Sequence, residues 1–220
     1  MNMSIQSRVL NEIPGLIHGF GTLVEPIPQV IKPVWDLKPV WKQVHGESWA
    51  QVSSPRQGCG EVDALITRVR GVPIGIMTAD CVPILLAHES GTAGAAIHAG
   101  WRGTHARIVE KLWRFLESQG ESAHQWVACI GPSIGSCCYE VSEELAESFQ
   151  KEFQEFSPSR FLPRHRHLDL PQIHEQTLHR LGFKKVERLS YCTRCSVAPQ
   201  FHSYRREGAG YRQWSMLLMS

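Results

Sequence analysis

Apolar residues in the middle of the chain occur in short runs that glycine and polar residues separate. The runs cover residues 64–67, 72–77, 82–87 and 93–98. Runs this short, bounded by turn residues, predict buried strands. The segment WVACIG at 126–131 and the segments 186–191, 200–205 and 211–219 fit the same description, and the last two are expected to pair as a hairpin through Gly208 and Gly210.

Three segments show a helical pattern instead. The first is predicted from an N-cap at Thr104 to Gly120, with apolar residues on one face. The second opens at Ser142, which two glutamates follow, and reaches about residue 153. The third begins at Pro171 and ends before Gly182.

The first third of the chain is rich in proline and glycine, which predicts short strands and loops there rather than helices. No repeat, low-complexity tract or polar linker divides the sequence. We therefore predict a single domain over residues 1–220, of the α/β (α+β) class, with a mixed, twisted β-sheet flanked by about three helices.

Composition narrows the class of protein. The 220 residues are 42% hydrophobic and 20% charged, with a net charge of +2, which is ordinary for a soluble globular protein and does not indicate a nucleic-acid or membrane partner. The N-terminus lacks a secretory signal pattern, so we expect a cytoplasmic protein. Seven cysteines at uneven spacing are then better interpreted as thiols or metal ligands than as disulfides.

Three residues at or beside predicted strand ends form a candidate metal site. Cys81 adjoins one buried strand, His98 ends another, and His45 lies in a short KQVHG segment. Two histidines and one cysteine suit zinc, and three protein ligands leave a fourth position open, as in catalytic zinc sites. The alternative is structural, because a cysteine in an apolar run is usually a small core residue and a lone histidine is usually hydrogen-bonded.

Several motifs, in a consistent order, resemble the bacterial laccase-domain family, also described as the multicopper polyphenol oxidoreductase or zinc-dependent purine nucleoside phosphorylase family. They are KQVHG, EVDALIT, TADCVPILLA, AAIHAGWRGT, IGPSIGSCCYEV, HLDL, CT and FHSYRREGAGYR. The resemblance covers about residues 60–218. It implies a catalytic zinc held by His45, Cys81 and His98.

The resemblance also implies an activity. Family members are described as cleaving adenosine, inosine, guanosine and methylthioadenosine with phosphate, and some as deaminating adenosine. Phosphorolysis needs a cationic clamp for phosphate, and Arg102 is our first candidate, with Arg205 and Arg206 as further phosphate or ribose contacts. For each arginine the alternative is a surface salt bridge.

Other residues near these motifs receive secondary roles. Asp80 is a candidate base or orienting residue beside Cys81, although a turn cap explains it equally well. Trp101, Cys138 and Tyr139 are expected to line the substrate pocket. A thiol nucleophile in the CCYEV segment is a less favoured enzyme alternative. The CxxC of Cys192 and Cys195 has no second such pair, so a zinc knuckle or redox motif is not favoured.

The chain departs from the family pattern near its N-terminus. Leu23 stands where the family has an arginine, and the stretch before KQVHG is short. This departure bears on the substrate and leaves the three expected metal ligands unchanged. Two alternatives remain: a copper-dependent phenol oxidase (Cu²⁺ in place of Zn²⁺), for which three ligands are few, and a metal-stabilised binding protein without activity. We expect purine nucleoside and phosphate as small-molecule partners and a monomer or homodimer.

Overall fold

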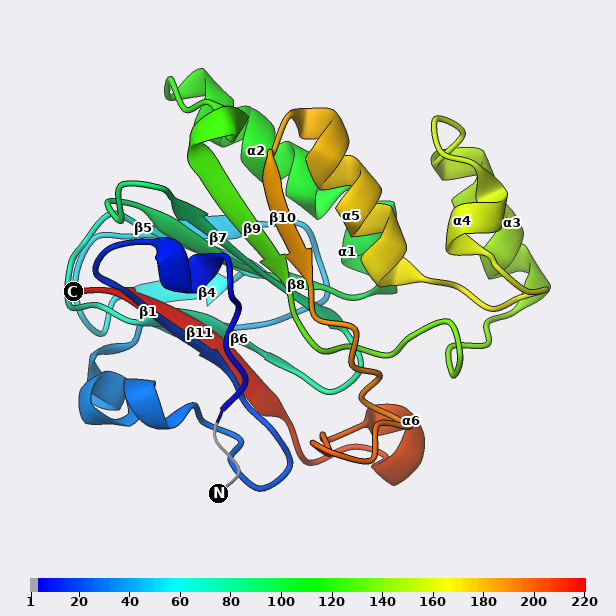
Figure 1. The fold of residues 1–220 in the computed structure, drawn as a ribbon, viewed down its shortest axis with the longest axis horizontal. Coiled ribbons are helices and arrows are strands. Elements are labelled where there is room, and N and C mark those ends of the chain that lie inside the picture. Colours follow the sequence, from blue (N-terminus) through cyan, green and yellow to red (C-terminus); the bar gives the residue numbers. More distant parts are fainter. Residues whose placement is uncertain (1–3) are drawn as a thin grey trace.

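A computed structural model describes residues 4–220. The chain forms three layers, in which a six-stranded sheet lies between a layer of helices and a smaller, three-stranded sheet (Figure 1). Helices α1, α2 and α5 lie along one face of the large sheet, and α3 and α4 extend this layer beyond it. The α/β class with a mixed sheet is thus confirmed.

The six-stranded sheet has the order β10-β9-β7-β8-β5-β3. Its central strands β9, β7, β8 and β5 pair antiparallel, while β10 and β3 join the two edges in parallel. The bounds are β3 Trp49–Val52, β5 Ala64–Thr67, β7 Val82–His88, β8 Gly94–Ala99, β9 Trp126–Ile130 and β10 Lys185–Arg188.

The three-stranded sheet joins the start and the end of the chain. Strand β11 (Gln213–Met219) lies between β1 (Leu16–Phe20) and β6 (Ile74–Thr78), antiparallel to both. A separate parallel pair consists of β2 (Val40–Lys42) and β4 (Gly58–Glu61).

Alternation along the central strands explains the layering. In β7, Ile84 and Leu86 belong to the core beneath the helices, whereas Leu85 and Ala87 belong to the core shared with the three-stranded sheet. Successive side chains of this strand point to opposite sides, and both faces are buried because a core packs against each of them. This is why the central runs are apolar throughout instead of alternating with polar residues.

Three helices are ten residues or longer, in agreement with the prediction of about three. These are α2 (Ile108–Ser118), α3 (Glu143–Glu152) and α5 (Leu170–Leu181). The side-chain oxygen of Ser142 accepts a hydrogen bond from the Leu145 N–H, which confirms that N-cap. Shorter helical segments are α1 Trp101–His105, α4 Pro158–Phe161, α6 Tyr204–Glu207 and the 3₁₀ turns Leu10–Glu12, Gln29–Leu37 and Ala123–Gln125.

The predicted helix from Thr104 to Gly120 is two helices. Helix α1 begins at Trp101, directly after Gly100, and ends at His105; α2 begins at Ile108. Arg107 interrupts them with a left-handed backbone, φ 61°. Thr104 is not an N-cap, since its hydroxyl donates to the Gly100 carbonyl one turn back.

The predicted C-terminal hairpin is wrong. Residues 204–207 form α6, and β11 pairs with β1 and β6 rather than with the segment 200–205. The long-range sheet outcompetes the local pairing because it buries Met216, Leu217 and Met219.

None of the helices described in residues 4–220 combines the length and apolar character needed to cross a membrane. The single-domain organisation stays a prediction.

Candidate metal centre and active-site pocket

The three predicted metal ligands come together at one end of the sheets. Cys81 lies in the turn between β6 and β7, His98 near the end of β8, and His45 in the loop after β2. Their ligand atoms all lie within 4.8 Å of one another. Strand pairing brings two of them close, because Val82 opposes Ala99 and Pro83 opposes His98.

The carboxylate of Asp63 accepts hydrogen bonds from the side chain of His98 and from the backbone of the loop that carries His45. The buried carboxylate accepts the His98 Nδ1–H at 2.7 Å, which leaves Nε2 as the ligating atom. The same carboxylate accepts the backbone N–H groups of His45 at 2.9 Å and Gly46 at 2.6 Å. One carboxylate therefore holds both a ligand side chain and the loop that carries a second ligand.

Gln43 fixes the same loop against β6. Its side-chain amide donates to the Met77 carbonyl at 2.8 Å and accepts the Met77 N–H at 2.7 Å. His45 itself has a left-handed backbone, φ 60°, which is uncommon for a residue with a side chain. Such a conformation persists only where surrounding contacts hold it, and Gln43 and Asp63 supply them.

Cys81 and His98 shift each other's ionisation. Burial disfavours the charged forms of both Cys81 and His98, but their mutual attraction, the His45 contact and the Asp63 carboxylate outweigh it. The pKa of the Cys81 thiol is lowered to about 6 and the pKa of His98 is raised to about 9. A thiolate that forms near neutral pH is the form of cysteine that binds metal.

Gly100 lets the chain pass close to the ligands. A Cβ atom at this position would lie 3.0 Å from the Cys81 Sγ and 3.3 Å from the His45 ring. Any larger residue would therefore push against two ligands at once. The absence of a side chain at Gly100 is a packing requirement of the metal site.

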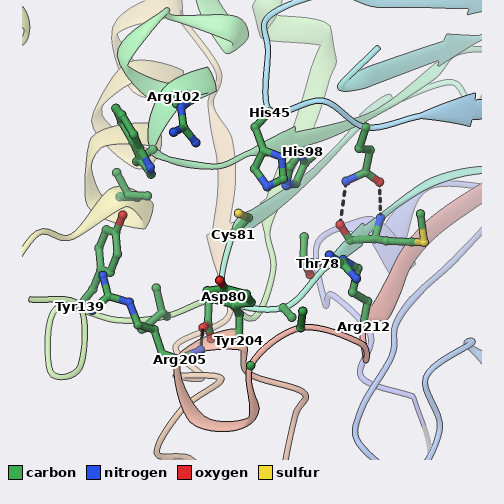
Figure 2. Close-up of a pocket in the computed structure, with 18 of the residues that line it drawn as sticks. His45, Thr78, Asp80, Cys81, His98, Arg102, Tyr139, Tyr204, Arg205 and Arg212 are labelled. Carbon is green, nitrogen blue, oxygen red and sulfur yellow. Dashed lines mark hydrogen bonds between the residues drawn. The ribbon is translucent and has the colours of Figure 1, made fainter. Parts of the chain in front are cut away.

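The cluster opens into a cavity of about 750 Å³, a size typical of small-molecule sites. Arg102, Arg205 and Arg212 line it, and among residues 4–220 none of these three has a carboxylate within ion-pair distance. Figure 2 shows Arg102 and Arg205 to one side of Cys81 and Arg212 to the other. The cavity thus combines the candidate metal ligands with three arginine side chains and one carboxylate, that of Asp80.

Asp80 also lines the cavity, and both its carboxylate oxygens accept hydrogen bonds. One accepts the Thr193 hydroxyl at 2.5 Å. The other accepts the backbone N–H of Arg205, which lies close by in Figure 2, at 2.7 Å. The residue has a left-handed backbone, with φ 89°. Asp80 therefore positions the segment that carries Arg205.

Two aromatic residues, Trp101 and Tyr139, line the cavity. The Arg102 guanidinium lies 4.4 Å from the centre of the Trp101 ring, and that of Arg205 lies 5.1 Å from the Tyr139 ring. Burial, reinforced by the charge of Cys81, raises the pKa of Tyr139 to about 12. Its hydroxyl therefore keeps its proton at neutral pH and is a hydrogen-bond donor.

Two other assignments are corrected. Cys138 does not line the cavity; its thiol lies in a cluster with Cys137, Cys192 and Cys195. Arg206 is an ordinary structural arginine, which pairs with Glu207 and donates to backbone carbonyls outside the cavity.

Sequence reasoning missed Asp63, Gln43 and Arg212. Asp63 belongs to the EVDALIT motif and starts a buried strand, where a charged residue is a recognisable signal. Arg212 ends the FHSYRREGAGYR motif but reaches the cavity only because the loop after α6 folds back. Leu23, the position of the expected arginine, is not among the residues that line the cavity.

Comparisons with known proteins find relatives whose names describe reactions of purine nucleosides. "Adenosine deaminase RL5" from an unknown prokaryotic organism is 36% identical over 154 residues, covering 67% of this chain and 58% of that protein. "Purine nucleoside phosphorylase" of Aquifex aeolicus (strain VF5) is 37% identical over 147 residues, covering 67% of this chain and 66% of its own length. The matches thus span less than two thirds of either relative.

The fold is that of a solved structure. YlmD from Geobacillus stearothermophilus superposes with a TM-score of 0.80 at 24% identity, covering 100% of this chain and 99% of that one. A family model described as multi-copper polyphenol oxidoreductase laccase matches residues 33–220. The match includes His45, Cys81 and His98 and confirms the resemblance of the motifs. This chain belongs to the multi-copper polyphenol oxidoreductase laccase family.

Proposed function

We propose that this protein is a zinc-dependent purine nucleoside phosphorylase, which cleaves adenosine, inosine, guanosine or methylthioadenosine with phosphate to give the base and ribose 1-phosphate. One observation carries the proposal: a candidate three-ligand metal cluster shares its cavity with three arginines that, within residues 4–220, have no carboxylate at ion-pair distance. The name of the Aquifex aeolicus relative supports the same activity.

The donor set fits zinc. Two imidazoles and one thiolate are typical zinc ligands, and the contact between Asp63 and His98 is the carboxylate–histidine arrangement common behind them. Three protein ligands leave one position for water or substrate. A bound zinc ion supplies an electrophile at that position. Multicopper oxidation requires many more histidines than the two in this cluster, so we disfavour a phenol oxidase.

Arg102 is the residue we assign to phosphate. Its guanidinium is exposed at the N-terminal end of α1, and stacking on Trp101 restricts its orientation. A planar guanidinium can hold two phosphate oxygens at once. In phosphorolysis one phosphate oxygen bonds to the anomeric carbon while the bond to the base breaks, so fixing phosphate beside the ribose lowers the barrier.

The nucleoside is assigned to the walls around Tyr139 and Arg205. Tyr139 supplies an aromatic face and a hydroxyl that keeps its proton, and Arg205 lies over the ring. Asp80 holds the backbone N–H of Arg205 and so fixes this wall. Electron density that leaves with the base or builds up on the phosphate is stabilised by the nearby guanidinium groups.

Deamination of adenosine is a second reaction that we propose for the same cavity. The relative named adenosine deaminase RL5 supports it. His45, Cys81 and His98 would hold the ion, which would activate water for attack on a purine ring. This reaction consumes water and does not need phosphate, so omitting phosphate separates the two activities.

Kinetics of an Arg102 variant test the proposal. We expect Arg102→Ala to raise the KM for phosphate roughly 10-fold or more, with a smaller effect on the KM for inosine, because one charge-assisted contact is lost. Arg114→Ala, an exposed arginine on α2, serves as the control. A wild-type enzyme whose base release does not depend on phosphate would contradict the proposed activity, and a larger effect on inosine would contradict the role of Arg102.

A further inference from the structure

A second cluster of sulfur ligands lies outside the pocket. It is formed by Cys137, Cys138, Cys192 and Cys195, whose sulfur atoms all lie within 4.8 Å of one another. The first two follow the loop after β9, and the other two follow β10, so segments more than fifty residues apart in the chain meet here. Neither the proposed reaction nor the pocket uses these thiols.

We propose that these four cysteines bind a second zinc ion, in a closed structural site. Tetrahedral zinc with Zn–S bonds of about 2.3 Å places neighbouring sulfurs about 3.8 Å apart. The sulfurs of Cys137 and Cys195 are 3.6 Å apart, close to this spacing and far beyond the roughly 2.0 Å of a disulfide. Four thiolates and no open position are typical of structural rather than catalytic zinc.

The turn that carries Cys192 and Cys195 already has the local structure of a metal-binding knuckle. The sulfur of Cys192 accepts the Gly135 N–H at 3.4 Å and is also approached by the N–H groups of Arg194 and Cys195. Backbone donors aimed at a sulfur stabilise its thiolate form, which is the form that binds zinc. The C-x-x-C spacing therefore coincides with suitable geometry.

The two cysteine loops are joined by backbone contacts that do not involve a metal. Ser133 and Cys192 form a parallel bridge, and the Thr193 N–H donates to the Ser133 carbonyl at 3.0 Å. These contacts hold the sulfurs in place before an ion binds. A preformed site spares zinc much of the cost of ordering the loops.

Three arginines supply positive charge around the cluster. Arg164 donates to the Ser136 and Cys137 carbonyls at 3.1 and 3.2 Å, and Arg194 donates to the Cys138 carbonyl at 3.4 Å. Arg206 donates to the carbonyls of Thr193 and Arg194. Because zinc with four thiolates carries a net negative charge, guanidinium groups on the same loops offset it.

The location gives the proposed ion a role in the fold. Cys138 directly precedes Tyr139, which lines the cavity, and Cys192 directly precedes Thr193, whose hydroxyl binds Asp80. A metal that ties these segments together would stabilise one wall of the pocket from behind. The ion would not contact the substrate. We therefore expect its loss to lower the stability of the protein more than it lowers the rate of the reaction.

Zinc content of the purified, reduced protein tests the proposal. We expect Cys195→Ser to carry one zinc ion fewer per chain than the wild type, and Cys59→Ser, a cysteine outside the cluster, to retain the full content. A variant with both His45→Ala and His98→Ala should lose the pocket ion but keep the tetrathiolate ion. This double variant shows whether the four cysteines bind zinc independently of the pocket and of the proposed enzymatic activity.

A measurement on the wild-type protein covers the case in which Cys195→Ser does not fold. Cys137 and Cys195 are exposed, so as free thiols they would react quickly with iodoacetamide. With zinc bound they should be protected, and a chelator should restore their reaction, as mass spectrometry of peptides would show. Rapid alkylation before chelation, a Cys137–Cys195 disulfide, or iron in place of zinc would each overturn the proposal.

Discussion

At the scale of single residues, Asp63 links the metal ligands to the fold. It is fully buried, and burial opposes its ionisation. Hydrogen bonds from His98 and from the backbone of the His45 loop outweigh this effect and hold the pKa of its carboxyl below the usual range. The carboxylate is thus charged at neutral pH and can orient His98 through Nδ1.

Replacing Asp63 tests this role. We expect Asp63→Asn to weaken zinc binding at the pocket about 10- to 100-fold, because the amide loses the charge that orients His98. Competition against a chromophoric chelator measures the affinity, and Asp36→Asn, at an exposed position, is the matched control. An unchanged affinity in Asp63→Asn would remove Asp63 from the description of the site.

The sequence identified residues whose role follows from a strand end, and it missed those that depend on loops meeting in space. Cys81 and His98 adjoin apolar runs, so their place at the sheet edge could be predicted. Nothing local indicates that Cys138 faces Cys192, fifty-four positions later, instead of the pocket. Side-chain direction in a loop is set by long-range packing.

At the scale of elements, the junction between α1 and α2 shows why local patterns were insufficient. The sequence offers Thr104 as an N-cap four residues before the first apolar position of α2, Ile108, yet Arg107 breaks the helix between them. Its guanidinium binds Glu152 at 2.5 Å, Glu155 at 2.7 Å and Glu110 at 3.0 Å. Glu152 and Glu155 lie far from Arg107 in the sequence, so the pattern of apolar residues around the turn does not reveal these contacts.

His174 connects two helices behind the metal site. Its Nε2 lies 2.9 Å from the Thr104 hydroxyl, which joins α5 to α1, the helix that carries Trp101 and Arg102. Its Nδ1 is buried without a partner in the described residues. Burial alone lowers the pKa of His174 to about 3, so the folded protein keeps this ring neutral.

This burial predicts an acid-sensitive contact. Between about pH 6.5 and 3, His174 is protonated in the unfolded chain but neutral in the folded chain. The free energy of unfolding therefore decreases as the pH is lowered, by up to about 1.4 kcal/mol per pH unit. Above pH 6.5 the residue adds no pH dependence.

Urea unfolding at several pH values measures the effect. His174→Gln should show a shallower loss of stability between pH 6 and 4 than the wild type, while the exposed control His124→Gln should match the wild type. Part of the slope should remain, because burial also lowers the pKa of His18, to about 4. Identical slopes in His174→Gln and the wild type would contradict a neutral buried ring.

At the scale of the whole molecule, the layered fold places the site where several chain segments converge. The ligands come from three segments of the first half of the chain, whereas Arg205 and Arg212 come from its end. Strand β11 returns the end of the chain to the centre of the three-stranded sheet, which brings the arginines back to the ligands (Figure 1). Sequence patterns predicted most strands, but this return was missed because a local hairpin explained the same residues.

The central claim is that phosphate attacks the nucleoside in this cavity. Incubating the zinc-loaded protein with inosine and phosphate that carries heavy oxygen at all positions tests it most directly, with the product followed by mass spectrometry. We predict ribose 1-phosphate that retains every labelled oxygen, including the one bonded to the sugar, and loss of this product in Cys81→Ser. Free ribose without phosphate, or no cleavage by the zinc-loaded wild-type protein, would contradict the account.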